Sequence, residues 1–185
     1  DQLLVEDAVA PSNAPYRFGY PFQVNYDIFD VCSWESFGGE GSICRVKFVS
    51  RGAYAMRIIF DQFLLEEGSM VSVYNSDMTD IYGGYTSQNN SEDGYFSTPL
   101  VQGEELILEY YQSALSQGIS VLNAENIVHD YKDFLNFFST TSDRSCGDNV
   151  NCPEAASYQN QINSVAYIEI GWGLCSGGIV NNVRQ

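Results

Sequence analysis

Alternating hydrophobic and polar positions dominate the chain from residue 16 onward and predict short β-strands. The clearest alternation is SICRVKFV at residues 42–49, and runs rich in aromatic and β-branched residues follow it. Period-two alternation puts every second side chain on one face of a sheet, where it can cover a core. Strands are predicted at 42–49, 53–60, 70–74, 94–101, 106–111 and 119–122.

Dipeptides that contain glycine separate these runs and predict turns. They are Gly38-Gly39, Arg51-Gly52, Glu67-Gly68, Gly83-Gly84, Asp93-Gly94, Gln102-Gly103 and Gln117-Gly118. Short strands spaced by about 8–12 residues, with such turns, are typical of a β-sandwich or barrel. Alternation of strands with helices is absent, which argues against a doubly wound sheet. We therefore expect a mainly β fold with an antiparallel, jelly-roll-like β-sandwich.

Three breaks in this pattern divide the chain. Residues 1–15 are interpreted as an extended leader, because Pro11 and Pro15 block regular structure. The sandwich is expected over 16–138, where residues 133–138 form either a helical turn or a last strand. Residues 139–145 are polar and predict a linker.

The remaining segment, 146–185, is short for an independent core. It carries two further predicted strands, 162–170 and 175–180, which bracket the turn Gly171-Trp172-Gly173.

Composition narrows the classes of function. The formal net charge is −16, from 24 acidic and 8 basic residues. Nucleic acid is therefore not expected as a partner, because affinity for phosphate backbones comes from Lys and Arg. No run of 18 apolar residues occurs, so no membrane-spanning helix is predicted. Asp1 is interpreted as the start of a chain from which a signal peptide has been removed.

The five cysteines indicate an oxidising compartment, so we expect a secreted or periplasmic protein. Cys32 and Cys44 flank a hairpin-like segment, and a disulfide between them would stabilise the fold by roughly 3 kcal/mol. Two buried thiols are the alternative. Because the count is odd, at least one cysteine lacks a partner in the chain, even if Cys146 and Cys152 form a local bridge.

The tail carries the most specific motifs in the chain. SCGDNVNCPE at 145–154 has two closely spaced cysteines, the second followed by Pro-Glu, and Ser164-Val165-Ala166 and CSGGIVNN at 175–182 follow. These residues resemble the start of the mature enzyme in the lysyl endopeptidase type of trypsin-like serine proteases. In that family a strand similar to CSGGIVNN leads to the catalytic His and its adjoining Cys.

The part before the tail is similar to the propart of such secreted bacterial proteases. Its recurring segments are VSRGA at 49–53, IFDQF at 59–63, LEEGSMVSVY at 65–74, GYT at 84–86, FST at 96–98, VQGE at 101–104 and LEY at 108–110. The chain departs from the family at Leu64-Leu65, where many members have Leu-Pro. The resemblance implies a zymogen whose β-sandwich pro-region assists folding, inhibition or export, followed by the first strands of an incomplete trypsin-like β-barrel.

The resemblance places the catalytic Ser, His and Asp beyond Asn182, so none is carried over and the chain as given is expected to be inactive. It implies that Cys146, Cys152 and Cys175 pair with the remainder of the protease domain, on the same or a separate chain. The complete enzyme would cut a polypeptide substrate after Lys or Arg. His129 precedes the protease-like segment and is interpreted as a surface or capping residue, and Ser176 as a structural strand residue.

A zymogen needs a cleavage site between its two parts. Arg144 is the only basic residue between Lys132 and Arg184, and it lies in the polar linker. We expect cleavage at Arg144-Ser145 or just before it; an ordinary linker arginine is the alternative.

Acidic loops are the candidates for a cation. Asp77 and Asp80, and Glu92 and Asp93, offer the oxygen ligands that calcium prefers, although no EF-hand spacing occurs. Solvated turns are the alternative. No zinc, nucleotide or redox motif is present, so calcium is the one cofactor considered.

Two other functions remain open. A secreted, non-catalytic β-sandwich can bind carbohydrate or protein through exposed aromatic side chains, with Tyr82, Tyr85 and Tyr95 as candidates. A structural or adhesion subunit would instead pair with another protein by strand addition through residues 162–182.

Overall fold

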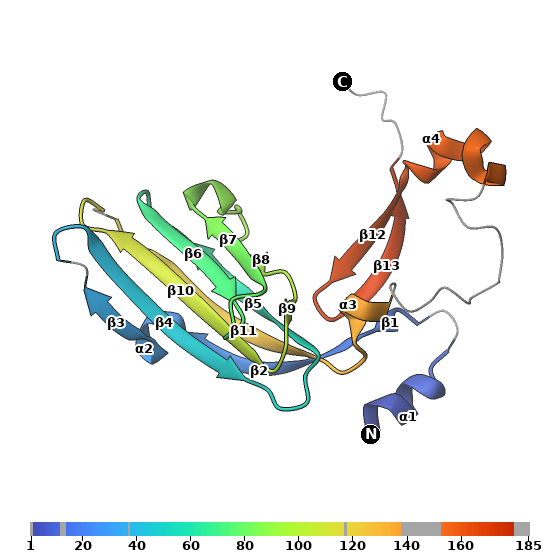
Figure 1. Cartoon of the computed structure of the whole chain (residues 1–185), viewed down its shortest axis with the longest axis horizontal. Helices are drawn as coiled ribbons and strands as arrows, with labels where there is room; N and C mark the ends of the chain where they lie inside the picture. The colour runs from blue at the N-terminus through green and yellow to red at the C-terminus, as the bar shows by residue number, and fades with distance from the viewer. Residues whose placement is uncertain (1, 12–13, 37, 117, 138–152, 180–185) are drawn as a thin grey trace.

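The computed structural model describes residues 2–11, 14–36, 38–116, 118–137 and 153–179 (Figure 1). Two antiparallel sheets form a β-sandwich, and a third, smaller sheet lies beside one end of it (Figure 1). The predicted fold class, a mainly β protein with an antiparallel sandwich, is confirmed. Among the described residues, no sheet closes into a barrel.

The two large sheets each place long strands in the middle and short strands at the edges. The first has the order β3 (Ser33–Ser36), β4 (Gly41–Val49), β10 (Glu105–Ser113), β6 (Ser69–Tyr74) and β7 (Ile81–Tyr85). The second has the order β2 (Gly19–Asp27), β11 (Val121–Asp130), β5 (Ala55–Leu64) and β8 (Phe96–Ser97), and β9 (Val101–Gln102) also pairs with β5.

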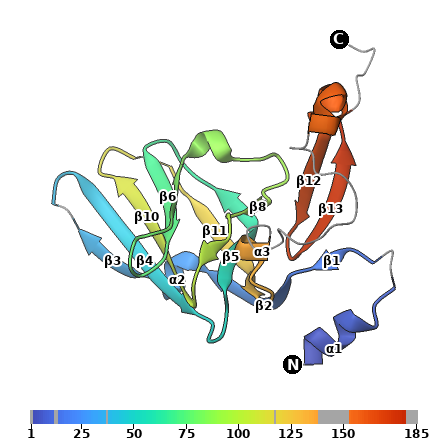
Figure 2. The same ribbon diagram turned by 45° about the vertical axis from the view of Figure 1, so that its right-hand side comes forward.

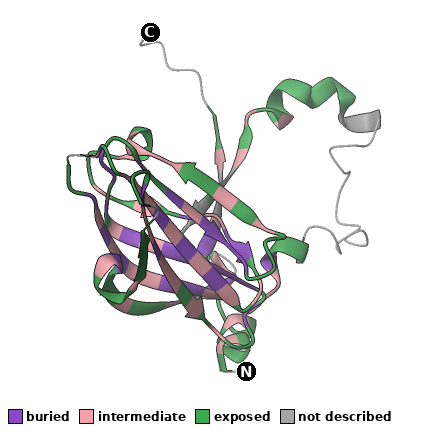
Figure 3. Cartoon of the chain, turned by 60° about the vertical axis from the view of Figure 1, so that its left-hand side comes forward, coloured by how far each residue is buried: buried purple, intermediate pink, exposed green. Residues whose placement is uncertain are grey.

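The core fills the space between these sheets. In β10, Leu106, Leu108 and Tyr110 are buried and alternate with partly exposed residues, as the period of two predicts. In β5, Ile58 and Phe60 are fully buried and meet them from the opposite sheet. Buried positions run as stripes along the sandwich strands in Figure 3, whereas the small sheet shows mainly exposed and intermediate positions.

Three sequence expectations in the sandwich differ from the structure. The strand predicted at 119–122 covers only the start of β11, which continues to Asp130. Gly83-Gly84 lies inside β7 instead of forming a turn, because the β6–β7 pairing shifts register between Val71 and Ser72. A Cβ atom on Gly83 would lie 2.7 Å from the Cα of Ser72, so this bulge requires glycine. The strand predicted at 94–101 is divided into β8 and β9, on either side of Pro99, which has no N–H to donate to a ladder.

The helices are short and lie outside the sheets. They are α1 (Gln2–Ala8), α2 (Ile28–Val31), η1 (Ser87–Asn89), α3 (Phe134–Phe137), η2 (Pro153–Tyr158) and α4 (Gln159–Ile162). α1 lies within the leader that was expected to be extended. Its leucines, Glu6 and Ala8 favour helix, and Pro11 restricts only itself and the preceding Ala10, both of which lie beyond the end of the helix. α3 decides the ambiguity at residues 133–138 in favour of a helical turn. No helix in the described part of the chain is long and apolar enough to span a membrane.

The small sheet joins the two ends of the chain. β12 (Val165–Ile170) and β13 (Gly173–Gly178) form an antiparallel hairpin, the tail hairpin, and β1 (Tyr16–Arg17) pairs with the outer edge of β13. The two tail strands predicted around Gly171-Trp172-Gly173 are therefore present. Figure 2 shows the tail hairpin standing beside the sandwich, with its turn near α3 and β1.

Candidate functional site at the junction of the sandwich and the tail hairpin

The chain passes from the small sheet into the sandwich with only Phe18 between β1 and β2. Tyr16 and Arg17 pair with Leu174 and Gly173 of β13. The N–H groups of Phe18 and Gly19 then both donate to the carbonyl of Trp172, at 3.2 Å each. One backbone run therefore belongs to both parts of the molecule and fixes the tail hairpin to the sandwich.

Arg57 of the sandwich contacts the turn of the tail hairpin. It is buried in β5, and its Nη1 donates to the carbonyl of Gly171 at 3.3 Å. Its guanidinium lies 5.7 Å from the centre of the Phe18 ring, which stacks on Phe134 at 4.6 Å. This geometry gives the turn a polar contact with the sandwich and places a cation against an aromatic face.

A second, smaller core lies at this junction. Its buried members are Phe18, Ala55, Leu100, Val128 and Phe134, and the tail hairpin contributes the partly buried Leu174. Beside it is a recess of about 450 Å³, lined by Arg57, Thr98, Leu135 and Gly171 among others. The tail hairpin thus packs against the sandwich through its turn.

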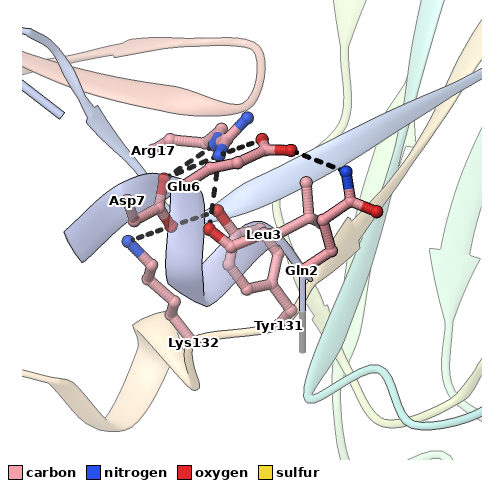
Figure 4. A network of polar contacts seen from close by, with 7 residues as sticks. All are labelled: Gln2, Leu3, Glu6, Asp7, Arg17, Tyr131 and Lys132. Atoms are coloured by element: carbon pink, nitrogen blue, oxygen red, sulfur yellow. Dashed lines mark hydrogen bonds and ion pairs between the residues drawn. The ribbon is translucent and has the colours of Figure 1, made fainter. Parts of the chain in front are cut away.

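A network of charges around Asp7, which we call the clasp, ties α1 to the same junction (Figure 4). The Asp7 carboxylate lies 2.8 Å from Arg17 Nη2 and 2.7 Å from Lys132 Nζ, and it accepts a hydrogen bond of 2.6 Å from the Tyr131 hydroxyl. Glu6 adds a second ion pair to Arg17 at 3.2 Å. The clasp therefore holds β1, which carries Arg17, against the end of β11.

The contacts within the clasp shift the pKa values of Asp7 and Tyr131. Burial alone would raise the pKa of Asp7, but hydrogen bonds from Lys132, Tyr131 and Arg17 outweigh it and lower the pKa. Burial, and then the hydrogen bond to Asp7, raises the pKa of Tyr131 well above its ordinary value. Asp7 is therefore charged and Tyr131 is neutral at neutral pH.

His129 lies on β11 next to the clasp and is half-buried. Its Nδ1 is hydrogen-bonded to the Ser50 hydroxyl at 2.8 Å, and burial lowers its pKa. Among the described residues, no carboxylate is hydrogen-bonded to the other ring nitrogen, which a catalytic triad would require. With Arg51, Tyr20 and Phe22, His129 borders a recess of about 690 Å³ beneath α1.

Of the predicted cysteine and cleavage residues, the structure describes Cys32 and Cys44 in full and the others only in part or not at all. Cys32 and Cys44 form the expected disulfide, with their Cα atoms 5.6 Å apart. Arg144, Ser145, Cys146 and Cys152 lie outside the described residues. Cys175 is on β13 opposite Ile168, and its side chain lies outside the described part of the chain.

Three of the predicted calcium ligands, Asp77, Asp80 and Asp93, accept hydrogen bonds from protein groups. Asp77 accepts hydrogen bonds within its own turn from the N–H and the hydroxyl of Thr79, and Asp93 does the same with Ser91 and Tyr95. Asp80 accepts a hydrogen bond from the Gln102 N–H. Within the described ranges, no group of three or more His, Cys, Asp or Glu side chains, Glu92 included, is placed to hold a metal ion.

The aromatic side chains proposed for carbohydrate binding are divided between core and surface. Tyr82 and Tyr85 are partly buried against the main core, and Tyr85 makes an edge contact with Phe96. Tyr95 is exposed. These positions do not form one aromatic surface.

Sequence reasoning missed the residues that build the junction, namely Asp7, Phe18 and Arg57. Arg57 had a visible signal, because it is the one charged residue in the apolar run AYAMRIIF at 53–60. A charge in such a run is buried and needs a partner. Asp7 gave no comparable signal, since its partners are 10 and about 125 residues away in the chain.

No protein family, curated protein or solved structure matches the chain.

Proposed function

We propose that the chain is the N-terminal part of a secreted trypsin-like serine endopeptidase precursor. In this proposal the β-sandwich is the pro-region, and residues from 146 onward begin the protease domain. The complete enzyme cleaves polypeptides by acyl transfer through a serine nucleophile. In this proposal the chain of residues 1–185 takes part in folding and docking and supplies no catalytic group.

The observation that carries the proposal is the addition of β1 to the edge of β13. An isolated two-stranded hairpin is marginally stable in water, whereas a third strand and packing against a neighbour stabilise it. Val165 and Ile168 of the tail hairpin are exposed, so the hairpin has little core of its own. A pro-region that supplies a strand and a turn support would hold the first hairpin of an unfinished domain in place.

The disulfide of the chain agrees with this proposal. Cys32–Cys44 is compatible with an extracellular protein, since disulfides persist in oxidising compartments. Cleavage at Arg144-Ser145 would release the covalent connection and leave the β1–β13 pairing and the Arg57 contact as the remaining attachment. The pro-region would then inhibit or dissociate according to the strength of this junction.

The proposal is tested on the native protein from the medium of its source organism. A fluorophosphonate probe labels active serine hydrolases, and the labelled polypeptide is then sequenced from its N-terminus. We expect a labelled endopeptidase that begins at Ser145 or within a few residues of it. If peptides from 156–179 occur only in polypeptides that the probe does not label, the proposal is wrong and the chain is a non-catalytic protein.

A further inference from the structure

β3 lies at the end of the sandwich remote from the tail hairpin, with α2 beside it (Figures 1 and 2). An aromatic recess is lined by residues of these two elements and of β10. Its volume is about 210 Å³, and its walls include Phe29, Trp34 and Tyr110. Gln112 and Gly118 add polar groups and backbone to the lining. No predicted site residue lies in this lining.

Strand register brings the rings together. Trp34 of β3 and Tyr110 of β10 both pair with Cys44 of β4, from opposite sides. Residues directly opposite one another project from the same face of a sheet, so both rings lie on the inner side. Phe29 of α2 then contacts both, with ring centres 5.9 Å from Trp34 and 4.9 Å from Tyr110.

The Cys32–Cys44 disulfide fixes this arrangement. Cys32 lies between Phe29 and Trp34 in the chain, and its partner is the residue that Trp34 and Tyr110 flank. The three rings are therefore held by one covalent link and two strand pairings. Trp34 keeps 49% of its surface exposed, so the recess is open to a ligand.

A carboxylate lies directly behind the polar wall of the recess. Glu66 is 8% exposed, and its Oε1 accepts hydrogen bonds from Gln112 Nε2 at 2.7 Å and from the Tyr110 hydroxyl at 3.4 Å. Its Oε2 makes no hydrogen bond with any described residue. A Cβ atom on Gly118 would lie 2.9 Å from this oxygen, so Gly118 is a thin part of the wall between Oε2 and the recess.

This carboxylate is charged without a neighbouring cation. Burial alone would raise the pKa of Glu66, but the nearby Ser116 and Gln112 side chains, the Gly118 backbone and Tyr110 favour the carboxylate and lower the pKa. None of the described ion pairs includes Glu66. The Glu66 carboxylate therefore has hydrogen-bond donors but no cationic partner among the described residues, and a cation that enters the recess would supply one.

We propose that this aromatic recess binds the side chain of a lysine or arginine from a polypeptide partner. Aromatic faces attract an ammonium or guanidinium group, and a carboxylate within the wall adds a charge partner. The net charge of −16 raises the local concentration of basic partners around the protein. This inference goes beyond the proposed function and holds whether or not the chain belongs to a protease precursor.

The test uses Trp34 as a reporter. Trp34 and Trp172 are the two tryptophans of the chain, so in a Trp172→Phe background Trp34 is the single tryptophan, which can be excited selectively over the tyrosines. The probes are acetylated tripeptide amides Gly-X-Gly in which X is lysine, arginine or norleucine. We expect saturable changes in Trp34 emission with lysine and arginine, and at least tenfold weaker binding with norleucine.

Variants separate the recess from general attraction to an acidic protein. Glu66→Gln should weaken binding of the lysine peptide at least tenfold, whereas Glu67→Gln removes the same charge from the adjacent, exposed residue and should change it less than twofold. Phe29→Leu keeps an apolar wall and should weaken binding severalfold, which provides a second test if Glu66→Gln does not fold. Circular dichroism establishes that each variant is folded.

Three results would overturn the inference. They are equal effects of the two glutamate variants, equal binding of the norleucine peptide, and binding of a neutral oligosaccharide that the Glu66→Gln change leaves intact. The last would make the recess a saccharide site. Calorimetric titration of the same peptides checks that the emission change reports binding.

Discussion

At the scale of single residues, Asp130 joins the end of β11 to α3. Its side chain is completely buried, and its two oxygens accept hydrogen bonds from the N–H groups of Lys132 and Phe134, at 2.8 Å each. Burial raises its pKa despite these bonds. The residue orders the backbone that carries both Lys132 of the clasp and Phe134 of the junction core.

We expect Asp130→Ala to lower the free energy of unfolding by about 1–3 kcal/mol, because two buried N–H groups lose their acceptor. Urea unfolding followed by circular dichroism measures this change. Asp30→Ala is the control, since Asp30 is an exposed acid in α2, and it should change stability by less than about 0.5 kcal/mol. Equal effects of the two variants would contradict the role given to Asp130.

Asp7 is the residue on which the attachment of α1 depends. No residue of α1 is buried, so its polar contacts are its main connection to the rest of the chain. We expect Asp7→Asn to speed amide hydrogen exchange in α1 roughly fivefold, which corresponds to about 1 kcal/mol for partly buried ion pairs. Glu6→Gln should have a smaller effect, because Glu6 is more exposed than Asp7. If exchange in α1 is unchanged in Asp7→Asn, other contacts hold the helix.

The same residue predicts a response to acid. Because the pKa of Asp7 is lower in the folded protein, its stabilising contribution is present above the unfolded pKa of about 3.9 and is lost as pH falls through the folded pKa. Protection of the α1 amides should therefore decrease below about pH 4 in the wild type. In Asp7→Asn the protection should be low at every pH, and an acid response of equal size in that variant would contradict the assignment.

At the scale of elements, the turn of the tail hairpin is its point of contact with the sandwich. Gly171 has φ of 62°, and a Cβ atom there would lie 3.1 Å from Ile59 Cδ1. We expect Gly171→Ala to cost about 1–2 kcal/mol in this left-handed conformation and to increase amide exchange in β12 and β13. Gly39→Ala is a suitable control, because Gly39 lies in another strand connection with open space around it. Unchanged exchange in the hairpin would show that the turn does not fix it.

The elements also show how far the sequence could predict the fold. Alternation located the central strands β4, β5, β6 and β10, because one face of each is buried, and glycine dipeptides located most of the turns. Most of β11 was missed, because the strand predicted at 119–122 overlaps only its first residues. Gly83-Gly84 was misread because a glycine that a bulge requires has the same local signal as one in a turn. α1 was missed because a short helix without buried residues leaves no apolar period in the sequence.

The candidate site was less accessible to sequence reasoning than the fold. The Cys32–Cys44 pair was predictable from its isolation in the β-rich part. The junction joins residues 16–19 to residues 171–174, and the recess joins Phe29 and Trp34 to Tyr110 and Glu66. Such neighbours depend on register across several strands, which a pattern of period two does not specify.

At the scale of the whole molecule, one disulfide supports both the edge of a sheet and the recess. We expect the double variant Cys32→Ser, Cys44→Ser to lose about 3 kcal/mol of stability on the chain-entropy model and roughly 10 °C in melting temperature. It should also bind the lysine peptide more weakly, since Phe29 and Trp34 lose their covalent anchor. Reductant should reproduce these effects in the wild type and add little in the variant. A variant with unchanged melting temperature and affinity would contradict the role of the bridge.

The long separation between β1 and β13 has a consequence for the order of events during synthesis. The sandwich can close once residue 130 has emerged from the ribosome, whereas β1 pairs with residue 174, which follows 174 − 130 = 44 residues later. At about 5–20 residues per second this interval lasts a few seconds. Lys132 and Tyr131 emerge at its beginning, so the clasp can form while β13 is still being made. The clasp would thus hold β1 in position before its partner strand, β13, has been synthesised.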